Sequence, residues 1–174
     1  MEKLDKALLL KALAELGQLV RKPTMLVIGG SAALLLREEL TRVTTDCDVM
    51  RATPDMGALQ EAIRVVADRF DLAGGWLNGS AQTYAEILPP DFEGRLHTLP
   101  IFGLLRVALL SRQDVLVMKL YAARPRDIAD MALLVPTAGE LQFALTQLPH
   151  LARIDIHRAA RMQIRLEQMI HAQV

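Results

Sequence analysis

Residues 25–31 have the sequence Met-Leu-Val-Ile-Gly-Gly-Ser, and an Ala/Leu-rich segment follows them as far as Leu40. A short apolar run before paired glycines, with a serine at a common helix-cap position, predicts a strand, a tight turn and a helix in succession. Glycine lets the backbone approach a bound group closely, and the helix offers unpaired N–H groups. Gly29, Gly30 and Ser31 are therefore candidates for holding a phosphate, and a turn with a purely structural role is the alternative.

A second motif, Thr-Thr-Asp-Cys-Asp-Val-Met, occupies residues 44–50 and predicts a second strand over Asp46–Met50. Alternate side chains of a strand share a face, so Asp46 and Asp48 should project together while Cys47 turns the other way. Two adjacent carboxylates repel each other unless a cation lies between them, and hard oxygen ligands suit Mg²⁺ or Mn²⁺ held jointly with substrate phosphates. We therefore expect a metal site here, with two solvated acids at a strand end as the alternative.

Apolar spacing and proline positions predict that most of the remaining chain is helical. Glycine and proline pairs interrupt every periodic run in residues 71–110, where Tyr84–Leu88 and Leu104–Leu110 are the two candidates for further strands. The few aromatic residues and the abundance of Leu and Ala predict an aliphatic core and a helix-rich α+β or α/β fold. The expected helices cover residues 3–20, 54–70, 111–124, 125–134, 139–148 and 151–172.

The charge balance narrows the classes of function. Twenty basic residues equal twenty acidic ones, which excludes a protein that coats duplex nucleic acid through a long-range field. One local basic stretch recurs at helical spacing, either as a contact surface for nucleic acid or as a solvated helix face. It consists of Arg153, His157, Arg158, Arg161 and Arg165.

Cysteine usage and apolar run lengths predict the compartment. The single cysteine, Cys47, rules out an internal disulfide and argues against a thiolate metal site. No apolar run approaches the roughly 20 residues that span a bilayer, and the N-terminus has an amphipathic pattern instead of a signal peptide. We expect a cytoplasmic, non-membrane protein of one domain, residues 1–174, with a sheet-containing core in 1–110 and a helical portion in 111–174.

Taken together, the two motifs resemble the signature of the DNA polymerase β-type nucleotidyltransferase superfamily. The resemblance implies an α+β fold, with a small mixed sheet flanked by helices and a helical C-terminal half. It also implies that Gly29, Gly30 and Ser31 hold a nucleoside triphosphate while Asp46 and Asp48 bind Mg²⁺ or Mn²⁺.

Residues 114–130 are similar to the lysine and Arg/Lys-Asp motifs of AbiEii-type nucleotidyltransferases, which commonly act as toxins in toxin–antitoxin pairs. By this resemblance, Lys119 contacts the nucleotide phosphates and Asp127 belongs to the active site, as a base or as an orienting group. Thr45 and Arg126 join the residues that bind the nucleotide. The implied reaction moves a nucleoside monophosphate to a hydroxyl acceptor such as an RNA or transfer RNA end, and the implied protein partner is an antitoxin.

The residues themselves leave alternatives open. Lysines on exposed helix faces are common, and an acid in the first turn of a helix is stabilised by the helix dipole whether or not it is catalytic. Arg124 and Arg126 can bind phosphate or pair with Asp127 and Asp130, and pairing is preferred for Arg124. Many superfamily members carry a third carboxylate on a later strand, yet residues 104–110 contain none. Either Asp127 substitutes, or the protein transfers nucleotide poorly; a small-molecule acceptor and a non-catalytic binding module are the remaining alternatives.

Overall fold

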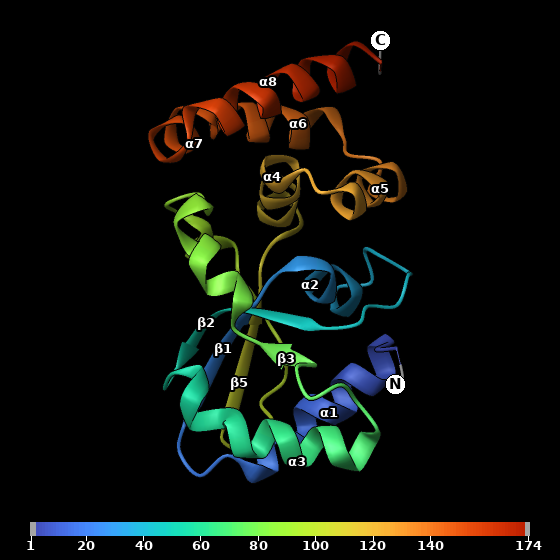
Figure 1. Ribbon diagram of the computed structural model, residues 1–174, viewed down its shortest axis with the longest axis vertical. Coiled ribbons are helices and arrows are strands. Elements are labelled where there is room, and N and C mark those ends of the chain that lie inside the picture. Colours follow the sequence, from blue (N-terminus) through green and yellow to red (C-terminus); the bar gives the residue numbers. More distant parts are fainter. Residues whose placement is uncertain (1–2, 173–174) are drawn as a thin grey trace.

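A five-stranded mixed sheet, in the order β3-β2-β1-β5-β4, forms the centre of the computed structural model, which describes residues 3–172 (Figure 1). β1 pairs in parallel with β5 and antiparallel with β2, while β3 and β4 are short strands at the two edges. The helix-rich α+β class predicted from the sequence is confirmed. The strands are β1 (Thr24–Ile28), β2 (Cys47–Thr53), β3 (Leu77–Asn78), β4 (His97–Thr98) and β5 (Leu105–Leu109).

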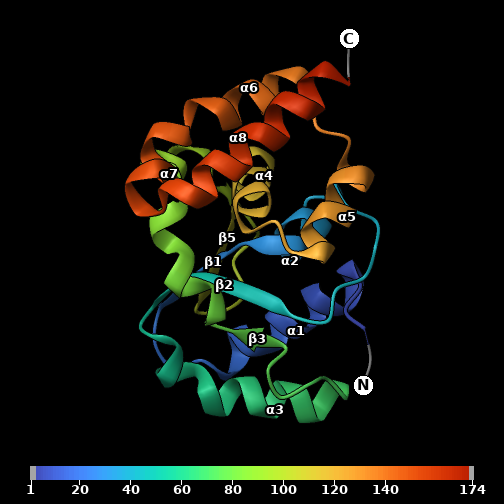
Figure 2. The same ribbon diagram turned by 45° about the horizontal axis from the view of Figure 1, so that its top comes forward.

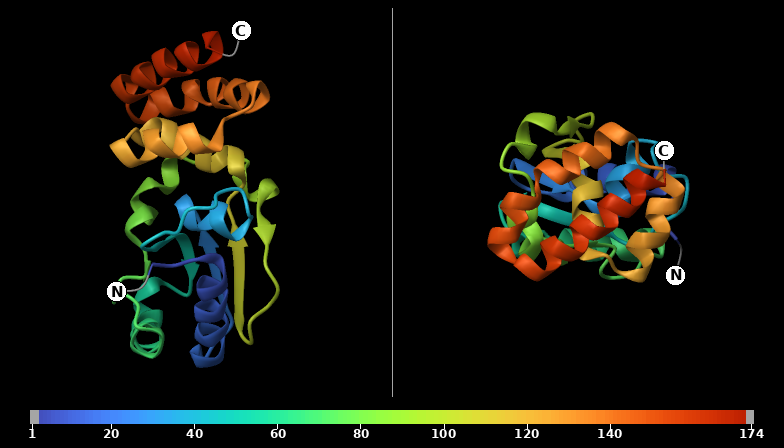
Figure 3. Two further views of the ribbon diagram at one scale, coloured as in Figure 1. Left: turned by 90° about the vertical axis from the view of Figure 1, so that its right-hand side faces the viewer. Right: turned by 90° about the horizontal axis from the view of Figure 1, so that it is seen from above.

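The helices gather at the two ends of the molecule. α1 and α3 pack together at one end, and α4 to α8 form layers at the other, beyond α2 (Figures 1 and 3). No helix within residues 3–172 is both long enough and apolar enough to cross a membrane. The α-helices are α1 (Lys6–Leu19), α2 (Gly30–Leu36), α3 (Gln60–Phe70), α4 (Arg112–Ala122), α5 (Pro125–Leu134), α6 (Ala138–Thr146), α7 (Leu148–Ile154) and α8 (Ile156–His171), with 3₁₀ helices η1 (Met56–Leu59), η2 (Ser80–Ile87) and η3 (Phe92–Arg95).

Helix α4 connects the sheet to the helical layers. It begins after Ser111, whose side chain accepts a hydrogen bond from the Asp114 N–H and so caps the helix. α4 packs against α2 on one side and against α5, α6 and α8 on the others (Figure 2), so apolar residues around most of its circumference are buried. A polar side chain on this helix therefore has to find its partners inside the protein.

The predicted order of helix, strand, helix, strand and helix at the N-terminus is confirmed, with shifted boundaries. α2 ends at Leu36 and not at Leu40, because Glu38 adopts a left-handed φ of 61° and the Glu39 N–H donates to the Leu34 carbonyl. This hydrogen-bond pattern closes a helix C-terminus. The second strand is shifted too: β2 begins one residue later than predicted and continues to Thr53 because it pairs with β1 along that length. The helix predicted from residue 54 opens instead as η1 and becomes α-helical at α3.

Of the two strand candidates, one is confirmed and one is wrong. Leu104–Leu110 contains β5, but Tyr84–Leu88 lies within η2 and just beyond it. A 3₁₀ helix has three residues per turn, so Ala81, Tyr84 and Ile87 share one face, and all three line the same cavity. This repeat of three residues matches neither the period of a strand nor that of an α-helix, so the apolar pattern of the segment does not reveal it.

The C-terminal helices are shorter than predicted. Helices expected over 139–148 and 151–172 are instead α6, α7 and α8, because Asp155 interrupts the last one. Its backbone is extended, and its side chain accepts hydrogen bonds from the N–H groups of His157 and Arg158, so it caps α8. The predicted basic stretch is therefore divided between two helices, with Arg153 on α7 and its other members on α8.

Candidate functional site

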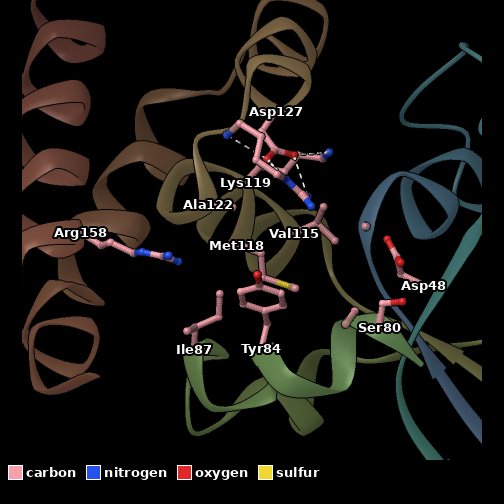
Figure 4. A pocket seen from close by; sticks show the side chains of 13 residues that line it. Asp48, Ser80, Tyr84, Ile87, Val115, Met118, Lys119, Ala122, Asp127 and Arg158 are labelled. Carbon is pink, nitrogen blue, oxygen red and sulfur yellow. Dashed lines mark hydrogen bonds and ion pairs between the residues drawn. The ribbon is translucent and has the colours of Figure 1, made fainter. Parts of the chain in front are cut away.

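A cavity of about 200 Å³ lies where the sheet meets the helical layers. Asp48 and Ser80 lie at one end, Arg158 of α8 lies at the other, and the Tyr84 ring lies between them (Figure 4). The cavity therefore has a polar end beside the sheet and a more apolar middle. Its remaining lining residues are Gly30, Ala81, Ile87, Val115, Met118, Lys119, Ala122, Arg124 and Asp127.

The Gly29-Gly30 turn lies directly against β2, the strand that carries Asp48 and that we call the carboxylate strand. The Gly29 N–H donates to the Asp48 carbonyl over 2.9 Å. A side chain at Gly29 would meet Met50 at 2.8 Å, and one at Gly30, which has a φ of 60°, would meet the Asp48 carboxylate at 2.9 Å. Only glycine fits both positions, so the close approach that the sequence suggested for a ligand is also required by the packing of the turn on β2.

Asp48 is a half-buried carboxylate at this end of the cavity. Its strand neighbours Cys47 and Val49 are fully buried on the opposite side, as the alternation predicts. Burial raises the pKa of Asp48 above its usual value, and the negative charge of Asp46 raises it further, against a smaller opposing influence of nearby cations. Among the described residues, no side chain forms a hydrogen bond or ion pair with its carboxylate. Asp48 therefore carries a negative charge that the protein leaves largely uncompensated.

Asp46 lies one residue before β2 and outside the cavity wall. The Thr44 hydroxyl donates to the Asp46 carbonyl over 3.0 Å, and the Thr44 and Thr45 hydroxyls each lie 3.5 Å from its Oδ1. These contacts hold Asp46 close enough to influence Asp48. Asp48 thus lines the cavity, and Asp46 lies outside its wall but near enough for its charge to raise the pKa of Asp48.

The donor set decides which kind of metal site is possible. No group of three or more His, Cys, Asp or Glu side chains in residues 3–172 is arranged to hold a metal ion. Mg²⁺ is commonly bound by one or two carboxylates, with substrate phosphates and water completing its ligands. Asp46 and Asp48 therefore fit a metal that is shared with a bound phosphate group.

Lys119 is not an exposed helix lysine. Its side chain is 6% exposed, and its Nζ lies 2.6 Å from Asp130 Oδ2 and 3.4 Å from Asp127 Oδ1. The same Nζ donates to the Ser31 hydroxyl over 3.3 Å. A buried ammonium requires such partners, and the contacts bring the predicted Ser31, Lys119 and Asp127 into one cluster.

Asp130 and Arg42 complete this cluster, and the sequence analysis assigned them no role in the site. The Arg42 guanidinium binds Asp130 through two contacts, Nε to Oδ1 over 2.6 Å and Nη2 to Oδ2 over 2.7 Å. Burial raises the pKa of Asp130, but hydrogen bonds from Arg42 and Lys119 outweigh it and lower the pKa to about 2. The three-residue spacing of Asp127 and Asp130 places both on one face of the helix. Arg42 lies 88 residues before Asp130, and no pattern in the sequence indicates that the two form an ion pair.

Asp127 is held by α5 itself. The Arg124 Nε donates to Asp127 Oδ2 over 2.7 Å, and the Arg124 backbone N–H donates to the same atom over 3.2 Å. The preferred pairing of Arg124 is thus observed, although its exposed side chain also lines the cavity. Arg126 lies outside the cavity wall and reaches Thr44 Oγ1 at 3.5 Å.

The far end of the cavity includes residues that the sequence did not single out for the site. Arg158 belongs to the predicted basic stretch, but its guanidinium lies 5.8 Å from the centre of the Tyr121 ring and faces the cavity. Arg165 donates to the Leu120 carbonyl over 3.2 Å and is partly buried. The basic stretch is therefore not one continuous exposed face.

The structure divides the predicted site residues into two groups. One group lines the cavity: Gly30, Asp48, Lys119 and Asp127. The other group lies next to it, behind the wall or on the rim: Gly29, Ser31, Thr45, Asp46 and Arg126.

The strand–Gly-Gly-Ser–helix turn packed on the strand of Asp48, with the buried Lys119 in the same cavity wall, agrees with the resemblance to the nucleotidyltransferase superfamily. Residues 7–136 match the family described as nucleotidyltransferase of unknown function (DUF6036), and the chain belongs to this family. Comparison with curated proteins and with solved structures yields no match. The matched region includes every predicted site residue, whereas α6, α7 and α8 lie beyond it.

Proposed function

We propose that this protein is a Mg²⁺- or Mn²⁺-dependent nucleotidyltransferase that moves a nucleoside monophosphate from a nucleoside triphosphate to a hydroxyl acceptor. The observation that supports this most strongly is the contact of the Gly29-Gly30 turn with Asp48. It places a backbone that phosphate can approach beside an uncompensated carboxylate in one cavity wall. Membership of a nucleotidyltransferase family supports a nucleotide as the substrate.

The phosphates bind at the polar end. The backbone N–H groups of Gly30 and Ser31 and the Lys119 ammonium donate to the phosphate oxygens, while Gly29, whose own N–H is bound to the Asp48 carbonyl, keeps the turn against β2. Thr45 and Arg126 take part in nucleotide binding. A divalent metal held by Asp46 and Asp48 supplies neutralisation of the phosphate charge and polarisation of the acceptor hydroxyl when it is bound. The acceptor oxygen bonds to the α-phosphorus, the bond from that phosphorus to the oxygen bridging the α- and β-phosphates breaks, pyrophosphate leaves, and the hydroxyl proton passes to water.

Asp127 acts as an orienting group in this proposal and not as the base. Its carboxylate is 1% exposed and already contacts Arg124 and Lys119. Both of its oxygens already accept hydrogen bonds from these two cations, so the carboxylate is engaged in holding them in place. Its effect on transfer is to hold the two cations at the cavity wall.

The middle of the cavity suits the rest of the nucleotide. The Tyr84 ring lies there between the polar end and Arg158 (Figure 4). Met118 and Ile87 add apolar surface to the same wall. A nucleobase can stack on an aromatic ring, and such stacking is worth about 1–3 kcal/mol per base.

We further propose that the acceptor is an RNA end, such as that of a transfer RNA, and that the protein acts as the toxin of a toxin–antitoxin pair. The exposed side chains of Arg153, His157 and Arg161 lie on α7 and α8, the latter of which carries Arg158 at the cavity. They offer local positive charge to a phosphate backbone. A small-molecule acceptor is the nearest alternative.

One observation favours a second function, a non-catalytic module that binds nucleotide. No third acid stands with Asp46 and Asp48 as a metal-binding group among the described residues. Such a module would bind nucleotide with Mg²⁺ and transfer nothing.

The deciding experiment incubates the protein with Mg²⁺, total RNA and each labelled nucleoside triphosphate. Label on RNA supports the RNA transferase, label on a small molecule supports the alternative acceptor, and binding without transfer supports the module. Asp46→Ala should abolish whichever activity appears, whereas Asp68→Asn, an exposed change on α3, should not. If the native protein neither transfers nor binds any nucleotide, the proposal is wrong.

A further inference from the structure

Asp130 and Arg42 lie behind the cavity wall and not in it. Neither lines the cavity, yet Asp130 contacts Lys119, which does, and Ser31, which follows Gly30 of the wall. Asp130 is 1% exposed and Arg42 is partly exposed. A ligand in the cavity would therefore contact residues that Asp130 and Arg42 hold in place, such as Lys119. It would not contact Asp130 or Arg42 directly.

Arg42 connects the carboxylate strand to α5. It lies in the segment that leads into β2, four residues before Asp46, and its two contacts with Asp130 use the planar fork of the guanidinium. A bidentate pair of this kind fixes orientation as well as distance. The start of the carboxylate strand is thus tied to one particular position on α5.

Asp130 also contacts Ser31 and Lys119, which the proposed function places on the phosphate side of the site. Its Oδ2 accepts from Lys119 Nζ over 2.6 Å and from the Ser31 hydroxyl over 3.3 Å. Arg42 Nη2 also donates to the Ser31 hydroxyl over 3.2 Å. The Lys119 ammonium lies nearer to Asp130 than to Asp127, so Asp130 has the larger part in setting where that ammonium lies.

We propose that Asp130 is a positioning residue which, through Arg42 and Lys119, fixes the phosphate-binding groups relative to the Asp46/Asp48 strand. This inference rests on the proposed function. A metal shared by two carboxylates and a phosphate requires both sides of the site at a set separation, and a displacement of 1 Å can lower turnover about 100-fold. Among the described carboxylates of the cluster, Asp130 is the one that contacts Ser31 and Lys119 on the phosphate side and also Arg42 in the segment before β2.

A purely structural role is the competing explanation. A buried ion pair adds little net stability compared with apolar packing, so stability alone gives weak grounds for placing charges here. The structure contains a matched pair for the comparison: Asp114 is 0% exposed and binds the Arg95 guanidinium at 2.7 and 3.2 Å. That pair likewise joins a separate segment of the chain, the end of η3, to an α-helix, and neither residue lines the cavity.

The test compares Asp130→Asn with Asp114→Asn in the full chain. Binding of ATP, GTP, CTP and UTP with Mg²⁺ is measured by titration calorimetry, and transfer is measured with the nucleotide that binds. Asp130→Asn should weaken nucleotide binding about tenfold and lower turnover about 100-fold. Asp114→Asn should lose a similar amount of stability in urea and keep nucleotide affinity within about twofold. Equal losses of affinity in both variants would make the role structural and overturn the inference.

Two further variants keep the test decisive if Asp130→Asn fails to fold. Arg42→Gln removes the guanidinium fork from a partly exposed position and should weaken nucleotide binding about threefold or more, and Arg42→Lys should restore only part of it because an ammonium lacks the fork. Native affinity in Arg42→Gln would contradict the proposal.

A double variant tests whether Asp130 acts through Lys119. If it does, Asp130→Asn combined with Lys119→Ala should lose less affinity than the product of the two separate losses. If the loss of affinity in the double variant equals the product of the two separate losses, the two residues act independently. Asp130 then does not act through Lys119. A native protein that binds no nucleotide overturns the proposed function together with this inference, whereas native binding with an unaffected Asp130→Asn overturns this inference alone.

Discussion

The two acidic clusters beside the cavity differ in how their charge is balanced. Asp127 and Asp130 are almost fully buried, and each is bound by two basic side chains. Asp48 is half-buried beside Asp46, and among the described residues no side chain forms a hydrogen bond or ion pair with its carboxylate. Burial raises the pKa of both acids, but hydrogen bonds from Arg42 and Lys119 outweigh it and lower the pKa of Asp130, whereas the charge of Asp46 raises that of Asp48 further.

This difference separates acids whose charge is balanced by basic side chains of the protein from acids whose charge is not. Burying a carboxylate without a partner is costly, and a folded protein tolerates the cost where a ligand later supplies the opposite charge. The Asp127/Asp130 cluster is satisfied by the chain alone, so neutralising one of its members should damage the fold. The Asp46/Asp48 pair is not satisfied, so neutralising one of its members should damage function and spare the fold.

The largest expected effect is on catalysis at the unsatisfied pair. Asp48→Asn should lower the rate of transfer about 10³-fold or more, because the metal contributes several kcal/mol of charge stabilisation in the transition state. The melting temperature should stay the same or rise slightly. Turnover with labelled nucleotide and a thermal melt check both results, with Asp68→Asn on α3 as the exposed control. A variant that unfolds would show that Asp48 is structural.

The opposite outcome is expected at the satisfied cluster. Asp127→Asn should lower the free energy of unfolding by about 3 kcal/mol or more, because it leaves Arg124 and the buried Lys119 with less compensating charge. Urea denaturation measures this loss. A change within about 0.5 kcal/mol would remove the distinction between the two clusters.

The sequence predicts one half of this comparison better than the other. Asp46 and Asp48 are separated by a single residue, so their closeness is local, although Asp46 lies before β2 and outside the cavity wall. The Gly-Gly turn before them also has a recognisable local pattern. The order of the N-terminal helices and strands also follows from local patterns, and the sequence predicts it. The ion cluster joins Ser31, Arg42 and Asp130 from distant parts of the chain, and a contact over 88 residues leaves no periodic trace.

The errors of prediction have similar physical causes. The face of η2 repeats every three residues, a period shared by neither strands nor α-helices, so its Tyr84 side was mistaken for a strand. The break at Asp155 depends on its side chain capping α8, and an aspartate within a periodic run gives no warning of that. Arg158 lies three residues after this break and lines the cavity, whereas the sequence assigns it only to a basic stretch.

A smaller effect is expected in the middle of the cavity, away from both clusters. Tyr84→Ala should weaken nucleotide binding about fivefold, equal to about 1 kcal/mol of lost stacking, and should leave stability unchanged because Tyr84 is 42% exposed. Tyr84→Phe keeps the ring and should bind as the native protein does. Titration with the nucleotide that binds checks the pair of variants. Equal affinities for Tyr84→Ala and the native protein would place the base elsewhere.

The smallest expected effect is a pH dependence that differs in sign between the clusters. The pKa of Asp48 is raised on folding, so its contribution to stability is greatest below its unfolded pKa and is lost as pH rises through its folded pKa. Asp48→Asn should therefore exceed the native free energy of unfolding by about 0.5–1 kcal/mol at neutral pH, and the two should converge as acid protonates Asp48. Asp130, with a pKa of about 2, stabilises above its unfolded pKa and loses this effect only as pH falls toward 2. Urea denaturation from pH 3 to 7 measures the free energy of unfolding of both variants relative to the native protein. The lower value of Asp130→Asn should persist across most of the pH range in which the higher value of Asp48→Asn disappears. Parallel curves for the two variants would contradict the assigned charges.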